Sequence, residues 1–310
     1  MKKLAYLSLV ITLFALIPGA FAVAPPPVYS QIRISWEGAT ELPFEVVESR
    51  PGVWAEVVVP EDGFHKLAAR GIPYETVIPD MAAFYASRLS SASPMDMGGW
   101  RTVEMIKGAL DSLAADYPEF VSGPDSIGAG RDGQAIWMIK ISDNVEIDED
   151  EPEVLIGLGI HAREVIAPEI IIQFAEWLME SFDTSEVAQH IVNEREVWLV
   201  PLMNPDGYYY NEITEPDGGG MWRKNRRNNG GGSYGVDLNR NFPHMWGYDD
   251  SGSSPDPSDE TYRGPSAGSE PETQAVMELV DSRNFRTSLS FHSYSNLYLS
   301  PWGYTFDLPP

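Results

Sequence analysis

The sequence predicts an α/β fold, with a mixed, largely parallel central sheet flanked by helices and a small α+β unit at the N-terminus. Helical and strand-like patterns alternate after about residue 100, which is typical of such folds. The apolar run Val154–Ile160 has the composition of a strand covered on both faces. The chain has 310 residues, of which 43% are hydrophobic, enough to form a large core.

Residues 1–22 have the pattern of a signal peptide. Lys2 and Lys3 precede the apolar stretch 4–17, and Ala20-Phe21-Ala22 is a small-x-small cleavage site. The apolar stretch is shorter than the roughly 20 residues that cross a bilayer, so cleavage is favoured over membrane anchoring. We therefore expect a secreted or periplasmic protein that is not held in a membrane after cleavage.

Residues 23–92 are predicted to form a separate small α+β unit that ends in a Ser-rich linker. The stretches 31–36, 53–59 and 74–78 read as strands, and residues 60–71 have helical spacing. No motif with chemical meaning occurs in this unit, so the chemistry is expected in residues 93–310.

The elements of residues 93–310 follow one another in α/β order. A helix with the apolar stripe Val103, Ile106, Leu110 and Leu113 comes first, and a hairpin around Arg131-Asp132-Gly133 follows it. The later predicted elements are the strand 154–160, the helix 169–181, the strand 196–202, the helix 271–283 and the strand 287–291. The polar stretches 211–235 and 247–268 are too long for ordinary connections, which indicates functional loops.

Composition excludes several classes of function. The formal net charge of −25 would repel polyanions over most of the surface, so no nucleic-acid partner is expected. The chain has no cysteine, which excludes disulfides, thiol nucleophiles and thiolate metal sites. Any metal must therefore be held by carboxylates or by some of the five histidines.

Two predicted strands end at residues that could bind a metal. His161 and Glu164 follow the strand that ends at Ile160, and His292 follows the strand 287–291. The carboxyl ends of parallel strands share one crevice, and a catalytic zinc site uses three nitrogen or oxygen ligands. A chance His-x-x-Glu pair and a hydrogen-bonded core histidine at position 292 remain open as alternatives.

Two arginine-rich motifs indicate a site for anions. Trp222-Arg223-Lys224-Asn225-Arg226-Arg227 concentrates cations in a chain that is short of them, and Asp237-Leu238-Asn239-Arg240-Asn241 adds a further guanidinium between amides. Guanidinium groups offer paired donors that suit a carboxylate or a developing oxyanion. The alternative is a basic patch that only balances acidic neighbours. Beside a zinc site, the two motifs favour a substrate with a free negative terminus.

From about Trp100 to its end, the chain resembles the M14 zinc carboxypeptidases, the family of carboxypeptidases A and B. Six segments carry the resemblance, in order: His161-x-x-Glu164, Asn204-Pro205-Asp206-Gly207, Trp222-Arg223-Lys224-Asn225-Arg226, Asp237-Leu238-Asn239-Arg240-Asn241, Gly264-Pro265 with Ser269-Glu270-Pro271-Glu272-Thr273, and His292-Ser293-Tyr294. Each segment is a modest signal, but together they occur in the order of the family.

The resemblance implies a metallocarboxypeptidase that hydrolyses the C-terminal peptide bond of peptides or proteins with zinc-activated water. His161, Glu164 and His292 would bind one Zn²⁺ per chain. Arg223 would be catalytic, stabilising the oxyanion of the tetrahedral intermediate.

Further roles follow from the same resemblance. Asn239 and Arg240 would bind the terminal carboxylate of the substrate, and Arg163 would line the next subsite inward. Residues 23–92 would be similar to an activation segment, or propeptide, that covers the active site.

One departure from the family concerns the end of the chain. The family has a glutamate general base and a substrate-binding tyrosine well downstream of the third metal ligand, but only 18 residues follow His292, none of them glutamate. We therefore expect the chain to lack a C-terminal part of the catalytic domain and, as given, to be largely inactive, because losing a general base costs about 10²–10⁴ in rate. The alternatives are a zinc peptidase acting on cell-wall peptides or acylated amino acids, and a non-catalytic zinc- or peptide-binding relative.

Overall fold

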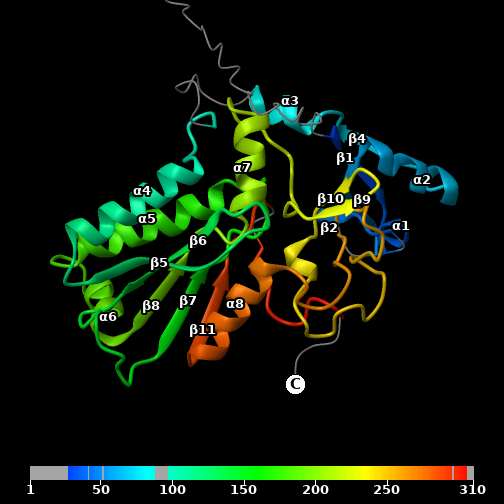
Figure 1. Cartoon of the computed structure of the whole chain (residues 1–310). Helices are drawn as coiled ribbons and strands as arrows, with labels where there is room; N and C mark the ends of the chain where they lie inside the picture. Colours follow the sequence, from blue (N-terminus) through cyan, green and yellow to red (C-terminus); the bar gives the residue numbers. More distant parts are fainter. Residues whose placement is uncertain (1–26, 41, 51, 88–96, 295–296, 306–310) are drawn as a thin grey trace, which may run out of the picture.

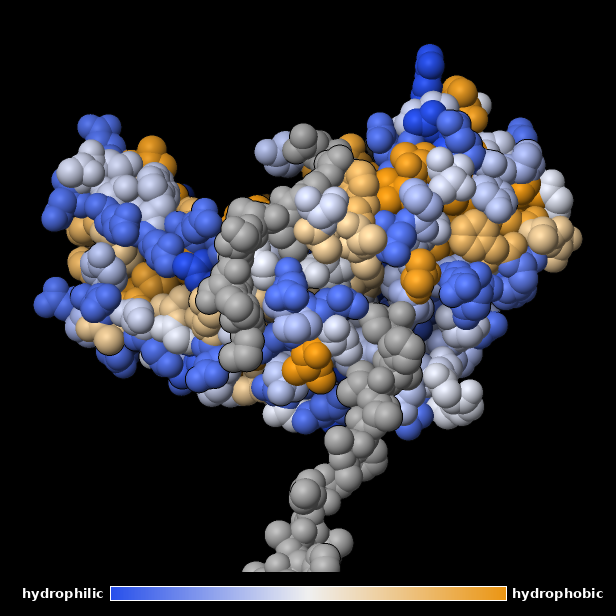
Figure 2. Space-filling view, turned by 90° about the horizontal axis from the view of Figure 1, so that it is seen from above, coloured by the Kyte–Doolittle hydropathy of each residue, from blue (hydrophilic) through white to orange (hydrophobic). Residues whose placement is uncertain are grey.

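A computed structural model describes residues 27–40, 42–50, 52–87, 97–294 and 297–305, so the predicted signal peptide lies outside the described residues. The described chain forms a small N-terminal unit and a larger α/β body that pack against each other (Figure 1). Within the described residues, no helix is both long enough and apolar enough to cross a membrane. The face in Figure 2 is mostly hydrophilic, with hydrophobic residues in scattered patches.

The N-terminal unit is a four-stranded antiparallel sheet with short helices. Its elements are β1 (Tyr29–Ser35), α1 (Trp36–Thr40), β2 (Glu45–Arg50), β3 (Trp54–Pro60), α2 (Phe64–Arg70), β4 (Glu75–Ile78) and α3 (Met81–Ala86). The strand order is β2-β3-β1-β4. Its own core includes Ile32, Val57 and Leu67, all at most 1% exposed. The α+β prediction is confirmed, although β2 was missed because its charged residues break the apolar alternation.

The body is built on a five-stranded mixed sheet in the order β11-β7-β8-β6-β5. The strands are β5 (Val121–Ala129), β6 (Ala135–Ile141), β7 (Glu153–Gly157), β8 (Glu196–Val200) and β11 (Phe285–Ser290). β11, β7 and β8 pair in parallel, whereas β6 is antiparallel to both β8 and β5. The prediction of a mixed α/β sheet is confirmed.

Helices cover both faces of this sheet. One core cluster joins β-strand residues such as Leu199 to α4 (Val103–Asp116), α5 (Ile166–Ser181) and α6 (Glu186–Glu194). A second cluster on the other face is closed by α8 (Pro271–Ser282). The remaining elements of the body are α7 (Pro205–Thr214), the short hairpin β9 (Asn228–Gly230) and β10 (Ser233–Tyr234), and a single turn of 3₁₀-helix at Leu238–Arg240; another such turn, Glu61–Gly63, joins β3 to α2 in the N-terminal unit.

β7 ends three residues earlier than the apolar run predicted. At Gly157 the backbone has φ of 141°, and a Cβ there would lie 2.2 Å from the carbonyl oxygen of Val200. Only glycine allows this close approach, and the chain then leaves the sheet toward His161. The apolar residues that follow, Leu158 and Ile160, are buried without being part of the strand.

A helix, α7, occupies residues 205–214, whose start carries the Asn-Pro-Asp-Gly motif. The side chain of Asn204 caps it by accepting a hydrogen bond of 3.0 Å from the Gly207 amide, and Pro205 occupies its first turn. The motif is therefore a helix start, which periodicity alone did not indicate because α7 is polar and aromatic on several sides.

Truncation of a buried side chain in the central strand β8 should destabilise the body. Leu199 is fully buried, so Leu199→Ala should reduce the free energy of unfolding by about 2–5 kcal/mol through lost burial and a cavity. Leu289→Ala, in β11, removes the same atoms from a side chain that is 48% exposed and should cost much less. Denaturant unfolding of both variants provides the comparison, and equal losses would contradict this packing.

Candidate metal centre

Three predicted ligand residues meet at one edge of the sheet. His161 and Glu164 lie in the connection between β7 and α5, and His292 lies just beyond β11. Because β7 and β11 are parallel neighbours, the chain leaves both strands at the same edge. The structure thus brings together side chains that are 131 residues apart.

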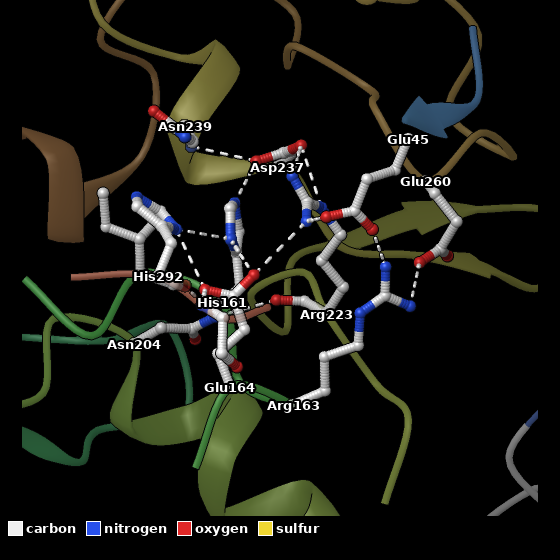
Figure 3. Close-up of polar contacts among 12 residues, drawn as sticks. Glu45, His161, Arg163, Glu164, Asn204, Arg223, Asp237, Asn239, Glu260 and His292 are labelled. Atoms are coloured by element: carbon white, nitrogen blue, oxygen red, sulfur yellow. Dashed lines mark hydrogen bonds and ion pairs between the residues drawn. The ribbon is translucent and has the colours of Figure 1, made fainter. Parts of the chain in front are cut away.

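The ligand atoms of these residues form a compact group (Figure 3). Nδ1 of His161 lies 2.7 Å from Oε1 of Glu164, and Nδ1 of His292 lies 2.9 Å from Oε2 of the same carboxylate. The two Nδ1 atoms are 3.0 Å apart. Two imidazole nitrogens and a carboxylate, all within 4.8 Å of one another, match the donor set of a zinc site.

Asp237 orients both a ligand and an arginine. Its Oδ1 lies 3.3 Å from Nε2 of His161, on the side of the ring away from the cluster, and its Oδ2 accepts hydrogen bonds of 3.1 and 3.0 Å from Arg223. Burial disfavours the charged carboxylate, but Arg223 outweighs it and holds the pKa of Asp237 well below its ordinary value. Such a carboxylate fixes the ring orientation of a ligand histidine.

Arg223 is 2% exposed and lies beside the cluster, with one guanidinium nitrogen 3.8 Å from Oε1 of Glu164. Burial opposes its charge, but Asp237 and the nearby glutamates raise its pKa. Its backbone carbonyl accepts a hydrogen bond from the Ala162 amide, at 3.0 Å, and Asn204 donates to the carbonyl of Ile160. These hydrogen bonds hold the segment that contains Arg223 against the segment that contains His161 and Glu164.

Glu45, from β2 of the N-terminal unit, reaches into this site. One carboxylate oxygen contacts Arg223 and the other contacts Arg163 (Figure 3). Burial opposes its ionisation, but the two guanidinium groups lower its pKa. Arg163 also lies 3.9 Å from Glu260, which accepts a hydrogen bond of 2.9 Å from the Tyr29 hydroxyl of the N-terminal unit.

The two other predicted binding residues lie at the rim rather than in the cluster. The backbone amide of Asn239 donates a hydrogen bond of 2.9 Å to Oδ1 of Asp237, while Asn239 itself is exposed. Arg240 donates to the backbone carbonyls of Gly252 and Asn239, at 2.6 and 3.0 Å. Among the described residues, no hydrogen bond or ion pair joins Arg240 to the His–Glu–His group.

A cavity of about 300 Å³ opens next to the cluster, between the two units. Arg163, Glu164 and Tyr294 line it from the body, and Glu45 and Met81 line it from the N-terminal unit. Most of its lining is apolar. The Tyr294 hydroxyl forms one contact between the two units by donating a hydrogen bond of 2.8 Å to the side-chain oxygen of Gln31.

Sequence reasoning gave no role to several of these residues. Asp237 stood in a recognised motif, yet its bonds to His161 and Arg223 join segments far apart in the chain. Glu45 and Glu260 carried no local signal. Neither residue lies in a predicted strand or helix, and only the fold shows what each one faces.

A mixed α/β sheet with a His–Glu–His group at its carboxyl edge and a buried arginine beside it defines a class of proteins with a metal centre suited to hydrolysis. The family model for zinc carboxypeptidases matches residues 106–310. Carboxypeptidase B of Astacus astacus is 36% identical over 219 residues, covering 69% of this chain and 68% of that protein. Carboxypeptidase A1 of Rattus norvegicus is 32% identical over 279 residues, covering 84% of this chain and 64% of the rat protein.

Solved structures agree on the fold. Carboxypeptidase A of Helicoverpa armigera superposes with a TM-score of 0.69 at 24% identity, over 86% of this chain and 70% of that one. Thrombin activatable fibrinolysis inhibitor gives 0.67 at 20% identity, over 90% and 75%. The chain belongs to the zinc carboxypeptidase family.

The buried pair of Asp237 and Arg223 yields a stability prediction. Asp237→Ala should remove the carboxylate that accepts two hydrogen bonds from the buried Arg223, leaving it only Glu45 and Glu164 as acidic neighbours, and should lower the free energy of unfolding by about 3 kcal/mol. Asp281→Ala removes an exposed carboxylate from the end of α8 and serves as the control, with a change within about 0.5 kcal/mol. Matching losses in chemical denaturation would show that the ion pair does not hold the site.

Proposed function

We propose that this chain is the catalytic region and preceding propeptide of an exported zinc metallocarboxypeptidase that removes the C-terminal residue of peptides or proteins. The observation that carries the proposal is the His161–Glu164–His292 group with Arg223 beside it. Family membership supports the same reaction. Export rests on the signal-peptide pattern of residues 1–22.

The proposed roles follow from position and chemistry. His161, Glu164 and His292 hold one Zn²⁺ per chain, which when bound supplies a Lewis acid and lowers the pKa of a water molecule to about 7. Arg223, held by Asp237, presents guanidinium donors at the edge of the metal group, where an oxyanion develops during attack on a peptide carbonyl.

The remaining residues bind the substrate in this proposal. Asn239 and Arg240 lie on the short turn that follows Asp237, and they receive the terminal carboxylate. Arg163 lines the next subsite, beside the cavity that leads away from the metal group. Peptides with a free C-terminus are therefore the proposed partners.

The N-terminal unit is proposed to act as a propeptide. Its Glu45 carboxylate engages Arg163 and Arg223 together, so the donors assigned to substrate are already bound. Its Tyr29 and Lys66 add contacts to Glu260 and Asp259 of the body. Removal of the unit would free both guanidinium groups for a peptide.

Activity tests the proposal directly. Protein produced from its natural gene, with the N-terminal unit released by limited proteolysis, should liberate the last residue of a peptide ending in a free carboxylate but not of the matched C-terminal amide. A chelator should abolish the reaction and Zn²⁺ should restore it. Equal cleavage of the amide, or hydrolysis that survives the chelator, would refute a metallocarboxypeptidase. Zinc and peptide binding without turnover would favour the non-catalytic relative.

Arg223→Ala in that protein should lower the rate by about 10²–10³, because a donor to the oxyanion is lost. Arg195→Ala is the matched control, since Arg195 immediately precedes β8 and so lies at the opposite edge of the sheet from the metal group. The rate of C-terminal residue release should be unchanged in the control.

Zinc binding can be tested on the 310-residue chain. One Zn²⁺ per chain should bind, and at a free concentration about 100 times the dissociation constant it should stabilise the fold by about 2.7 kcal/mol. His292→Ala removes a ligand and should abolish this gain, whereas His190→Ala, an exposed histidine on α6, should retain it. Metal analysis and thermal unfolding measure both effects; zinc binding unchanged in His292→Ala would contradict the assignment.

A further inference from the structure

Two glutamates at the start of α8 are completely buried. Glu270 occupies the N-cap position without a side-chain capping hydrogen bond, Glu272 lies in the first turn, and each residue has 0% exposure. Asn225, in the segment that carries Arg223, is equally buried and lies between them. Its side-chain amide donates to Oε2 of Glu270 at 2.9 Å and to Oε2 of Glu272 at 3.1 Å.

The other end of the Asn225 side chain joins two backbone segments. Its Oδ1 accepts hydrogen bonds from the amides of Val236, at 2.8 Å, and Arg227, at 3.2 Å. The backbone amide of Asn225 donates to the carbonyl of Val236 at 3.0 Å. Arg223 lies two residues before Asn225 and Asp237 directly follows Val236, so these bonds fix both members of the Arg223–Asp237 pair.

The surroundings of the two glutamates differ. The Glu270 carboxylate accepts hydrogen bonds from Arg227 at 2.8 Å, from Arg131 at 3.2 Å and from the Ser269 hydroxyl at 2.7 Å. Oε1 of Glu272, by contrast, is buried without a hydrogen-bond partner among the described residues. Glu270 is therefore stable as an anion, whereas a charge on Glu272 would be buried and poorly compensated.

We propose that Glu272 is a positioning residue that braces Asn225 as a neutral acid, and that its ionisation loosens the segments holding Arg223 and Asp237. Charged groups from every neighbouring element bear on it: Glu270 on the same helix, Asp206 on α7, Arg227 beside β9 and Arg131 in the β5–β6 turn. Both arginines are bound to Glu270. This proposal rests on the proposed function only for the role assigned to Arg223.

The direction of the pH effect follows from the burial of Glu272. Burial raises the pKa of Glu272 from its ordinary value of 4.5 to about 7, against weaker favourable contacts from its own backbone amide and Asn225. A carboxyl group whose pKa is higher in the folded state contributes its full stability below the unfolded value. That contribution is lost progressively as pH rises from about 4.5 to about 7, and it is gone above the folded pKa.

Amide hydrogen exchange of residues 222–241 in the 310-residue chain tests the proposal. After correction for the intrinsic exchange rate, protection should fall by up to about 10-fold per pH unit between about pH 4.5 and pH 7 and level off above 7, because opening releases one proton only in that window. Glu272→Gln should make the protection of this segment independent of pH. Glu278→Gln, at an exposed position on the same helix, should leave the wild-type profile unchanged.

A second measurement needs no variant. The carboxyl carbon of Glu272, followed by NMR in the wild-type chain, should titrate near pH 7, the pH at which the loss of protection levels off. A flat protection profile, an unchanged profile in Glu272→Gln, or a titration midpoint near that of an exposed glutamate would each overturn the proposal. None of these readouts requires zinc or substrate, so a negative peptidase assay would leave their outcome intact.

Discussion

One buried carboxylate connects the two functional groups of this site. Asp237 faces a ligand histidine with one oxygen and Arg223 with the other, and it is fully buried. The two hydrogen bonds from Arg223 are charge-assisted and directional, whereas the contact with Nε2 of His161, at 3.3 Å, is electrostatic. The ring of His161 and the guanidinium of Arg223 are thus oriented by the same group, so a shift of the segment 236–241 would disturb both.

Much of the fold and the metal group could be predicted from the sequence because they depend on local patterns. Apolar runs located β7 and β8, and the position of His161 and His292 after strands predicted that they converge. The end of β7 was misplaced because apolar residues beyond Gly157 are buried outside the sheet. The partners of Arg163 and Arg223 could not be predicted, since Glu45, which contacts both, belongs to another unit, and Asp237 meets Arg223 only in the folded chain.

The charge of the site differs from the net charge of the chain. The chain as a whole is strongly acidic, yet Arg163 and Arg223 lie together beside the His–Glu–His group, and Glu45 contacts both of them. Without that carboxylate, two buried guanidinium groups would lack a principal partner, which is unfavourable unless another anion replaces it. The N-terminal unit and a carboxylate-bearing ligand would therefore compete for the guanidinium groups of Arg163 and Arg223.

The central claim is that His161, Glu164 and His292 hold one metal ion together. X-ray absorption spectroscopy on the zinc-loaded chain tests it most directly. The account predicts two imidazole nitrogens at about 2.0–2.1 Å and carboxylate oxygen at about 2.0–2.2 Å, with one imidazole lost in His161→Ala. A zinc ion surrounded only by oxygen, or a spectrum unchanged by that substitution, would contradict it.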